Sequence, residues 1–144
     1  MKPKEFLSQL NEPQIVTSIA EAERNSSGEI RVYVSHKPRH DIMAAARARF
    51  AKLGMTQTRH RNGVLIYFAP LARKFAILGD MAIHEKCGDD FWKEVSAAMS
   101  EHLKKGEFTA AIVTAVKRVG AILAQHFPTE PGDKNELPDK VESD

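Results

Sequence analysis

Three polar residues next to glycines carry oxygen atoms that could bind a metal ion. Glu29 follows a glycine, Asn62 precedes one and Asp80 follows another. Two carboxylates and an amide oxygen, supplemented by Glu85 or by backbone carbonyls, make the oxygen-rich ligand set that Ca²⁺ prefers, whereas zinc and copper favour imidazole or thiolate ligands. We therefore expect Glu29, Asn62, Asp80 and Glu85 to form a calcium site. The structural alternative is that Glu29 lies at the solvated end of a strand, Asn62 takes the left-handed position of a turn and Asp80 caps the following helix.

A second possible chemistry is anion binding by the basic stretch 31–74, which contains ten Lys and Arg residues and one acidic residue. Such a stretch attracts anionic partners. Arg31, Arg61 and Arg73 are the candidate anion-binding residues. No helix-turn-helix or RNA-binding motif accompanies them, so the sequence does not favour nucleic acid as a partner. An anionic membrane surface stays open as a partner.

Histidine and cysteine add no recognisable site. Cys87 is the only cysteine and lies three residues after His84, but no second ligand pair completes a zinc site. Nearby carboxylates and apolar residues disfavour a reactive thiolate at Cys87. We therefore assign no catalytic residue and no organic cofactor.

The elements that must position these residues follow from hydropathy. Alternation predicts a strand over 29–35, an almost wholly apolar run predicts a buried strand over 63–69, and 74–79 returns as the second strand of a hairpin. Helical periodicity predicts helices before residue 27, from Asp41 to about 53, from Asp89 or Asp90 to about 105, and over about 108–126.

These elements define the fold class and bring the oxygen-bearing residues together. The β-α-β unit crosses over right-handed and makes the first two strands parallel, and the hairpin makes the third antiparallel. Helices on both faces give an α/β fold, a three-layer α/β/α sandwich with a small mixed β-sheet flanked by helices. The first two strands then begin, and the third ends, at the same end of the sheet. Glu29, Asn62 and Asp80 should therefore converge there.

The chain divides into one domain and a charged tail. Its 144 residues suit one domain, which we place at 1–127. From 129 to 144 there are six acidic and two basic residues and little apolar surface, so we expect 128–144 to be a mobile acidic tail. Whether this tail folds onto the basic stretch stays open.

Four short motifs, in this order, resemble the TPM domain family. They are Ser27-Gly28-Glu29-Ile30, Asn62-Gly63-Val64-Leu65-Ile66, Arg73-Lys74-Phe75-Ala76-Ile77-Leu78-Gly79 and Lys105-Gly106-Glu107-Phe108. The likeness covers about residues 12–127, and 79–86 and 135–139 resemble a short bacterial subgroup without a transmembrane tail. The resemblance implies a Rossmann-like sandwich. Family members are described as phosphatases, photosystem-repair factors or receptor auxiliary proteins, and some bind calcium.

Together these observations predict a bacterial TPM-like domain that binds a divalent cation at the sheet end and acts as an interaction module for an unidentified protein partner. One alternative is a metal-dependent acid-phosphatase-like hydrolase at the same site, in which the metal polarises a phosphoryl oxygen and an arginine holds the anion. No Cys-x5-Arg or Asp-x-Asp phosphatase motif is present. The other alternative is an anion-binding adaptor that uses residues 31–74.

A cytoplasmic location is expected for this domain. The first residues lack the apolar run of a signal peptide. The longest apolar run, Val64 to Ala72, is about half of a transmembrane span.

Overall fold

The computed structural model describes residues 1–129 and 140–144 of the chain. Its centre is a four-stranded mixed sheet with the strand order β3-β2-β1-β4. The strands are β1 (Glu29–Val34), β2 (Gly63–Ala69), β3 (Lys74–Gly79) and β4 (Val141–Ser143). β1 is parallel to β2 and to β4, and β3 is antiparallel to β2. The predicted α/β class and the parallel pairing of the first two strands are confirmed.

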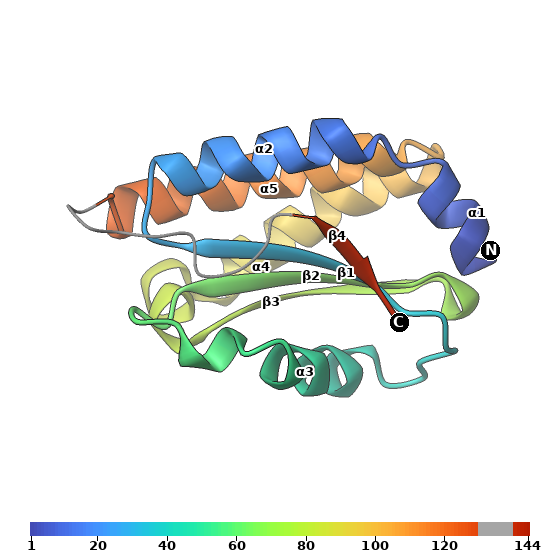
Figure 1. Ribbon diagram of the computed structural model, residues 1–144, viewed down its shortest axis with the longest axis horizontal. Helices are drawn as coiled ribbons and strands as arrows, with labels where there is room; N and C mark the ends of the chain where they lie inside the picture. The colour runs from blue at the N-terminus through green and yellow to red at the C-terminus, as the bar shows by residue number, and fades with distance from the viewer. Residues whose placement is uncertain (130–139) are drawn as a thin grey trace.

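Helices cover both faces of the sheet, which makes three layers (Figure 1). One face carries α1 (Pro3–Ser8), α2 (Glu12–Arg24), α4 (Met81–Lys104) and α5 (Phe108–His126). The other carries α3 (Ile42–Lys52) and the short 3-10 helix η1 (Met55–Gln57). A second 3-10 helix, η2 (Pro70–Ala72), joins β2 to β3.

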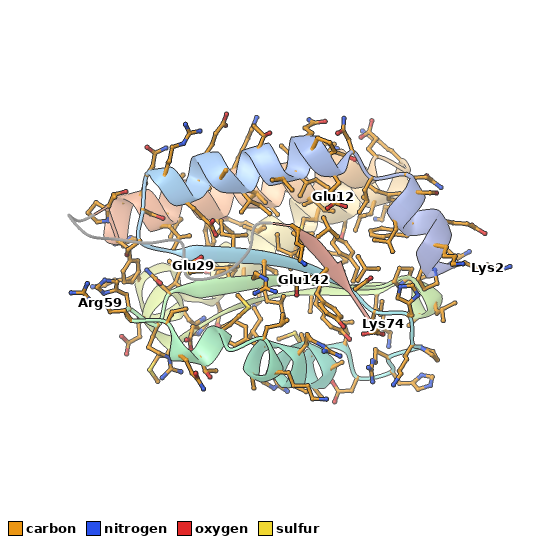
Figure 2. All side chains as sticks on the ribbon, viewed as in Figure 1. Lys2, Glu12, Glu29, Arg59, Lys74 and Glu142 are labelled. Atoms are coloured by element: carbon orange, nitrogen blue, oxygen red, sulfur yellow. The ribbon has the colours of Figure 1, made fainter. Side chains whose placement is uncertain are left out.

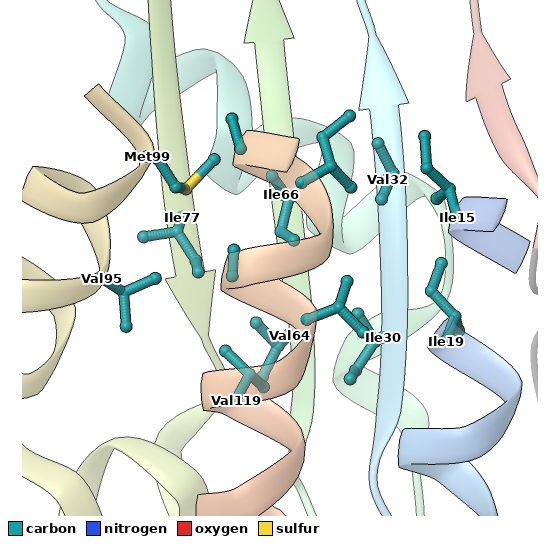
Figure 3. Packing of buried hydrophobic residues seen from close by; sticks show 14 of the residues in the cluster. Ile15, Ile19, Ile30, Val32, Val64, Ile66, Ile77, Val95, Met99 and Val119 are labelled. Atoms are coloured by element: carbon teal, nitrogen blue, oxygen red, sulfur yellow. The ribbon is translucent and has the colours of Figure 1, made fainter. Parts of the chain in front are cut away.

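Side-chain alternation along the strands divides the core into two clusters. The larger cluster lies between the sheet and helices α2, α4 and α5, where Ile30 and Val32 of β1 pack with Ile15 and Ile19 of α2 (Figure 3). The smaller cluster lies beneath α3 and contains Tyr33 with residues of β2, α3 and η1. Odd-numbered residues of β1 therefore face α3.

α5 is, among the described residues, the one helix that is long and apolar enough to cross a membrane. Seven of its residues are buried, and it lies against α2 and α4. Its place in the larger core cluster accounts for its apolar composition.

Helix α4 begins earlier than predicted. We expected a start at Asp89 or Asp90, but α4 begins at Met81, with Asp80 as its N-cap. Gly88 has φ 74° and interrupts the helical backbone. The Gly-Asp pattern in the sequence therefore marks a kink within the helix rather than its start, because glycine adopts positive φ without steric cost.

β4 was not predicted, and it lies within the segment expected to be a mobile acidic tail. It pairs with β1 from Val32 to Val34. The start of the same segment is also held, since Pro128 makes a β-bridge with Ser26. Residues 130–139 of the expected tail lie outside the described residues. A strand of three residues has no periodicity that sequence reasoning can detect.

Candidate functional site

Glu29, Asn62 and Asp80 lie at one end of the sheet. Glu29 stands opposite Gly63 in the β1–β2 pair, and the Asp80 N–H donates to the Gly63 carbonyl at 2.9 Å. Glu29 and Arg59 mark this end in Figure 2, and Lys74 marks the opposite end. The structure thus brings together the three residues that the topology predicted, and we call this region the sheet-end site.

The three side chains are almost completely buried. The exposed fractions are 2% for Glu29, 1% for Asn62 and 6% for Asp80. Burial of a polar group is unfavourable unless a partner compensates for the lost water. The partners of Asp80 and Asn62 therefore decide what the site can bind.

Asp80 is held by a cation of the chain itself. Arg61 donates from Nε to Oδ2 at 2.7 Å and from Nη2 to Oδ1 at 2.9 Å. The hydrogen bond and the charge of Asp80 raise the pKa of the Arg61 guanidinium. Asp80 Oδ1 also accepts from the Met81 N–H at 2.8 Å, which caps α4. The Arg61 side chain is 39% exposed, so solvent reaches this ion pair from the arginine side.

Only one of the two polar atoms of the Asn62 side-chain amide makes a hydrogen bond within the described residues. Its Nδ2 donates to Ser27 Oγ at 3.1 Å. Its Oδ1 is buried and has no hydrogen-bond partner in the part of the chain that the structure describes. A buried acceptor without a donor costs about 1–3 kcal/mol. This oxygen is therefore an available ligand.

Two further buried polar atoms lie in the loop before β2, which the sequence reasoning passed over. Thr58 Oγ1 and His60 Nε2 are buried, and neither has a hydrogen-bond partner among residues 1–129 and 140–144. Together with Asn62 they occupy alternate positions of the loop. All five residues from 58 to 62 are polar, so nothing in the sequence distinguishes the buried side chains from the exposed ones.

Glu85 does not join the buried residues. It is exposed on α4, after Asp80. Within the described ranges, no three or more His, Cys, Asp and Glu side chains are grouped closely enough to hold a metal ion. A cation at the sheet-end site would therefore depend on the amide oxygen of Asn62 and on backbone carbonyls as well as on carboxylates.

The three predicted anion-binding arginines do not form one site. Arg31 lies in β1 and makes an ion pair with Glu142 of β4. Arg61 binds Asp80 at the sheet-end site. Arg73 lies between η2 and β3, at the opposite end of the sheet, with a left-handed backbone.

A different cluster of anion-binding groups surrounds Asp144, near the end of β1. Its carboxylate accepts hydrogen bonds from Tyr33 Oη at 2.5 Å, from Ser35 Oγ at 3.0 Å and from the His36 N–H at 2.7 Å. Arg49 Nη2 lies 3.5 Å from it. Burial alone would raise the pKa of Asp144, but these hydrogen bonds and the charge of Arg49 outweigh burial and lower it.

Cys87 and His84 do not act as a pair. Burial raises the pKa of the Cys87 thiol, which disfavours the thiolate. His84 Nδ1 accepts a hydrogen bond from Trp92 Nε1 at 3.0 Å. The Nδ1 atom of His84 is therefore already occupied by a hydrogen bond from Trp92.

The part of the chain that is similar to known proteins includes the residues of the sheet-end site. The TPM domain family model matches residues 1–122. The chain is also similar to the BA42 protein of the psychrophilic bacterium Bizionia argentinensis, whose structure was solved by NMR. The two are 37% identical, the similarity covers 92% of each chain, and the TM-score is 0.84. No curated protein matches the chain. The family match ends before β4.

Proposed function

Because the chain belongs to the TPM domain family, we propose that it is a protein-binding module that responds to a divalent cation, calcium, at the sheet-end site. The observation that supports this most directly is the buried Asn62 Oδ1, which has no hydrogen-bond partner in the described residues. It lies at the same end of the sheet as the buried carboxylates of Glu29 and Asp80.

The donor set fits a hard cation. Ca²⁺ accepts six to eight oxygen ligands in flexible geometry, including amide and backbone carbonyls. In this proposal Glu29, Asn62 and Asp80 contribute side-chain oxygens, and Glu85 contributes only if its exposed side chain turns toward the site. The cation replaces Arg61 as the positive partner of Asp80, and Arg61 is then released toward solvent.

Cation binding at the sheet-end site would also change the surface formed by the loop before β2 and the start of α4. Arg61 belongs to the loop before β2, and Asp80 caps the first turn of α4. A cation bound by Asn62 of this loop and by Asp80 would hold the loop and the start of α4 in one arrangement. We propose that this arrangement is what a protein partner recognises.

A metal-dependent phosphatase at the same site is the alternative. It would need a group that holds the substrate anion beside the cation. Of the three arginines considered for that role, Arg61 is the one at this end of the sheet. The binding function needs no group that holds a substrate anion beside the cation, and it is therefore the better supported proposal.

The test is an NMR titration of the ¹⁵N-labelled chain with Ca²⁺, repeated with Mg²⁺ and Zn²⁺. We expect saturable amide shifts concentrated at residues 28–29, 62–63 and 79–85. Asp80→Asn should abolish them, whereas Asp90→Asn, at an exposed position of α4, should leave them unchanged. No response, or shifts confined to 140–144, would contradict the proposal. A steady rate on a phosphomonoester that Asp80→Ala removes would favour the phosphatase.

A further inference from the structure

The edge of the sheet at β1 is covered by the chain's own acidic segment. β4 runs parallel to β1, with Val32 opposite Val141, Tyr33 opposite Glu142 and Val34 opposite Ser143. In Figure 1, β4 lies in front of the second half of β1, with which it pairs, and Figure 2 labels Glu142 there. A strand added at a sheet edge gains main-chain hydrogen bonds whatever its sequence, and its side chains supply the specificity.

The first specific position is built around Arg31. Only 4% of this side chain is exposed, and Arg31 makes an ion pair with Glu142. Arg31 Nε is buried and has no hydrogen-bond partner in the described residues. A buried cation is strongly unfavourable unless an anion lies beside it. The strand next to β1 must therefore present an acidic residue opposite Tyr33, where Glu142 now stands.

The second specific position receives the carboxylate of Asp144. The donors around it are the Tyr33 hydroxyl, the Ser35 hydroxyl and the His36 N–H. Arg49, the fourth group, lies over the Tyr33 ring at 4.4 Å and so is held beside the carboxylate. These groups belong to β1, to the residues after it and to α3, so the site is provided by the body of the domain.

The segment that fills these positions is small. β4 has three residues, of which Val141 and Glu142 are only partly buried and Ser143 is exposed. A longer segment with the same anchoring residues would gain additional main-chain and side-chain contacts. We propose that the β1 edge is a docking site for an extended acidic segment of a partner protein, for which residues 141–144 are the chain's own occupant. The required pattern is an apolar residue, an acid, a small residue and an acid.

A peptide strand fits this surface better than a phosphate-bearing surface does. A lipid headgroup or a nucleic-acid phosphate could contact Arg31 and Arg49. It would leave the main-chain N–H and C=O groups of the β1 edge without the partners that β4 now provides. The inference goes beyond the proposed cation function, because Asp144 and the sheet-end site lie at opposite ends of β1.

The experiment uses the full chain with its own segment disabled. In the Glu142→Lys/Asp144→Lys variant, a fluorescent synthetic peptide with the sequence of residues 140–144 should bind and raise the fluorescence polarisation. The unaltered chain should bind the same peptide at least about tenfold more weakly, because its own segment occupies the site at high effective concentration. Glu12→Lys/Glu101→Lys makes the same charge change at exposed positions of α2 and α4 and should behave like the unaltered chain.

Specificity and competing ligands decide the outcome. A peptide with Lys in place of its Glu and Asn in place of its Asp should not bind, and Arg49→Ala in the variant should weaken binding several-fold. Equal binding by the variant and the unaltered chain would overturn the proposal. So would variant binding to phosphatidylserine vesicles but not to the peptide.

A second measurement does not depend on the variant's fold. Excess peptide added to the ¹⁵N-labelled unaltered chain should move the amide resonances of residues 141–144 toward unstructured positions. Resonances that stay fixed at millimolar peptide would also overturn the proposal.

Discussion

Arg61 illustrates how a side chain can occupy a position that a ligand would otherwise take. Its guanidinium makes two hydrogen bonds to Asp80, in the place where the cation proposal requires a metal. The same geometry is compatible with a purely structural role as a cap for α4. Substitution of the arginine distinguishes the two.

We expect Arg61→Met to increase the affinity of the chain for Ca²⁺ several-fold, since the variant removes the cation that competes for Asp80. Isothermal titration calorimetry at constant ionic strength measures the change. Arg59→Met, at an exposed position two residues earlier, is the control and should leave the affinity unaltered. An unchanged affinity in Arg61→Met would argue for the structural role.

Asp144 predicts a pH dependence of β4 docking. Its pKa is lowered in the folded chain, so its contribution to docking is fully present above the ordinary carboxyl pKa and is lost as the pH falls through the lowered value. The amide resonances of residues 141–144 should be constant between pH 7 and pH 5 and should shift below about pH 4. Asp144→Asn should show partly released resonances already at pH 7. Resonances of the unaltered chain that move between pH 7 and pH 5 would contradict this assignment.

The sequence allowed part of the sheet-end site to be predicted. Glu29, Asn62 and Asp80 could be placed together because strand direction alone determines which loops share an end of the sheet. Thr58 and His60 could not be selected, because whether a loop side chain is buried without a partner depends on the packing around it. The pairing of Arg61 with Asp80 likewise follows from three-dimensional contact.

Among the elements, β3 and α4 are joined by a close approach at Gly79. A Cβ at this position would lie 2.4 Å from Cζ2 of Trp92. The indole of α4 therefore packs directly over the backbone where β3 ends. The next residue, Asp80, is the N-cap of α4.

Gly79→Ala should lower the free energy of unfolding by about 1–3 kcal/mol, because the added methyl group overpacks the contact. Thermal or urea unfolding followed by circular dichroism measures the loss. Adding Trp92→Leu to the Gly79→Ala chain should reduce the additional cost of the alanine, since the smaller side chain leaves room for the methyl group. Full stability in Gly79→Ala alone would show that the indole can move away freely.

Elements with strong periodicity were predictable, and those held by distant contacts were not. β1, β2 and β3 follow from their apolar patterns, and α3 and α5 from helical spacing. The start of α4 was placed too late because Gly88 resembles a helix boundary. β4 depends on Arg31, in the middle of β1, and on the Ser35 and His36 groups that bind Asp144, all more than 100 residues earlier in the chain.

At the scale of the whole molecule, the Arg31–Glu142 ion pair ties the last described segment to the centre of the sheet. It joins β1 to β4 at a position where the arginine is almost completely buried. The effect of this pair therefore extends to global stability.

Glu142→Gln should lower the free energy of unfolding by about 1–3 kcal/mol, because Arg31 then lacks its anionic partner. In an Arg31→Met background the same substitution should cost much less, and urea denaturation of the four chains measures this coupling. Strictly additive effects would mean that the pair does not stabilise the fold.

Coverage of β1 by β4 also bears on how copies of the molecule behave toward one another in solution. A bare strand edge offers unpaired N–H and C=O groups to any other extended chain, and such edges promote aggregation. β1 is apolar along most of its length. Release of β4 would therefore expose a largely apolar strand edge with unpaired main-chain groups. Concentrated samples kept at a pH below the lowered pKa of Asp144, where its carboxyl group is protonated, should therefore scatter more light over time than samples at neutral pH. By covering the β1 edge, the short acidic strand would then prevent the domain from associating with other copies of itself, independently of any partner that binds at this edge.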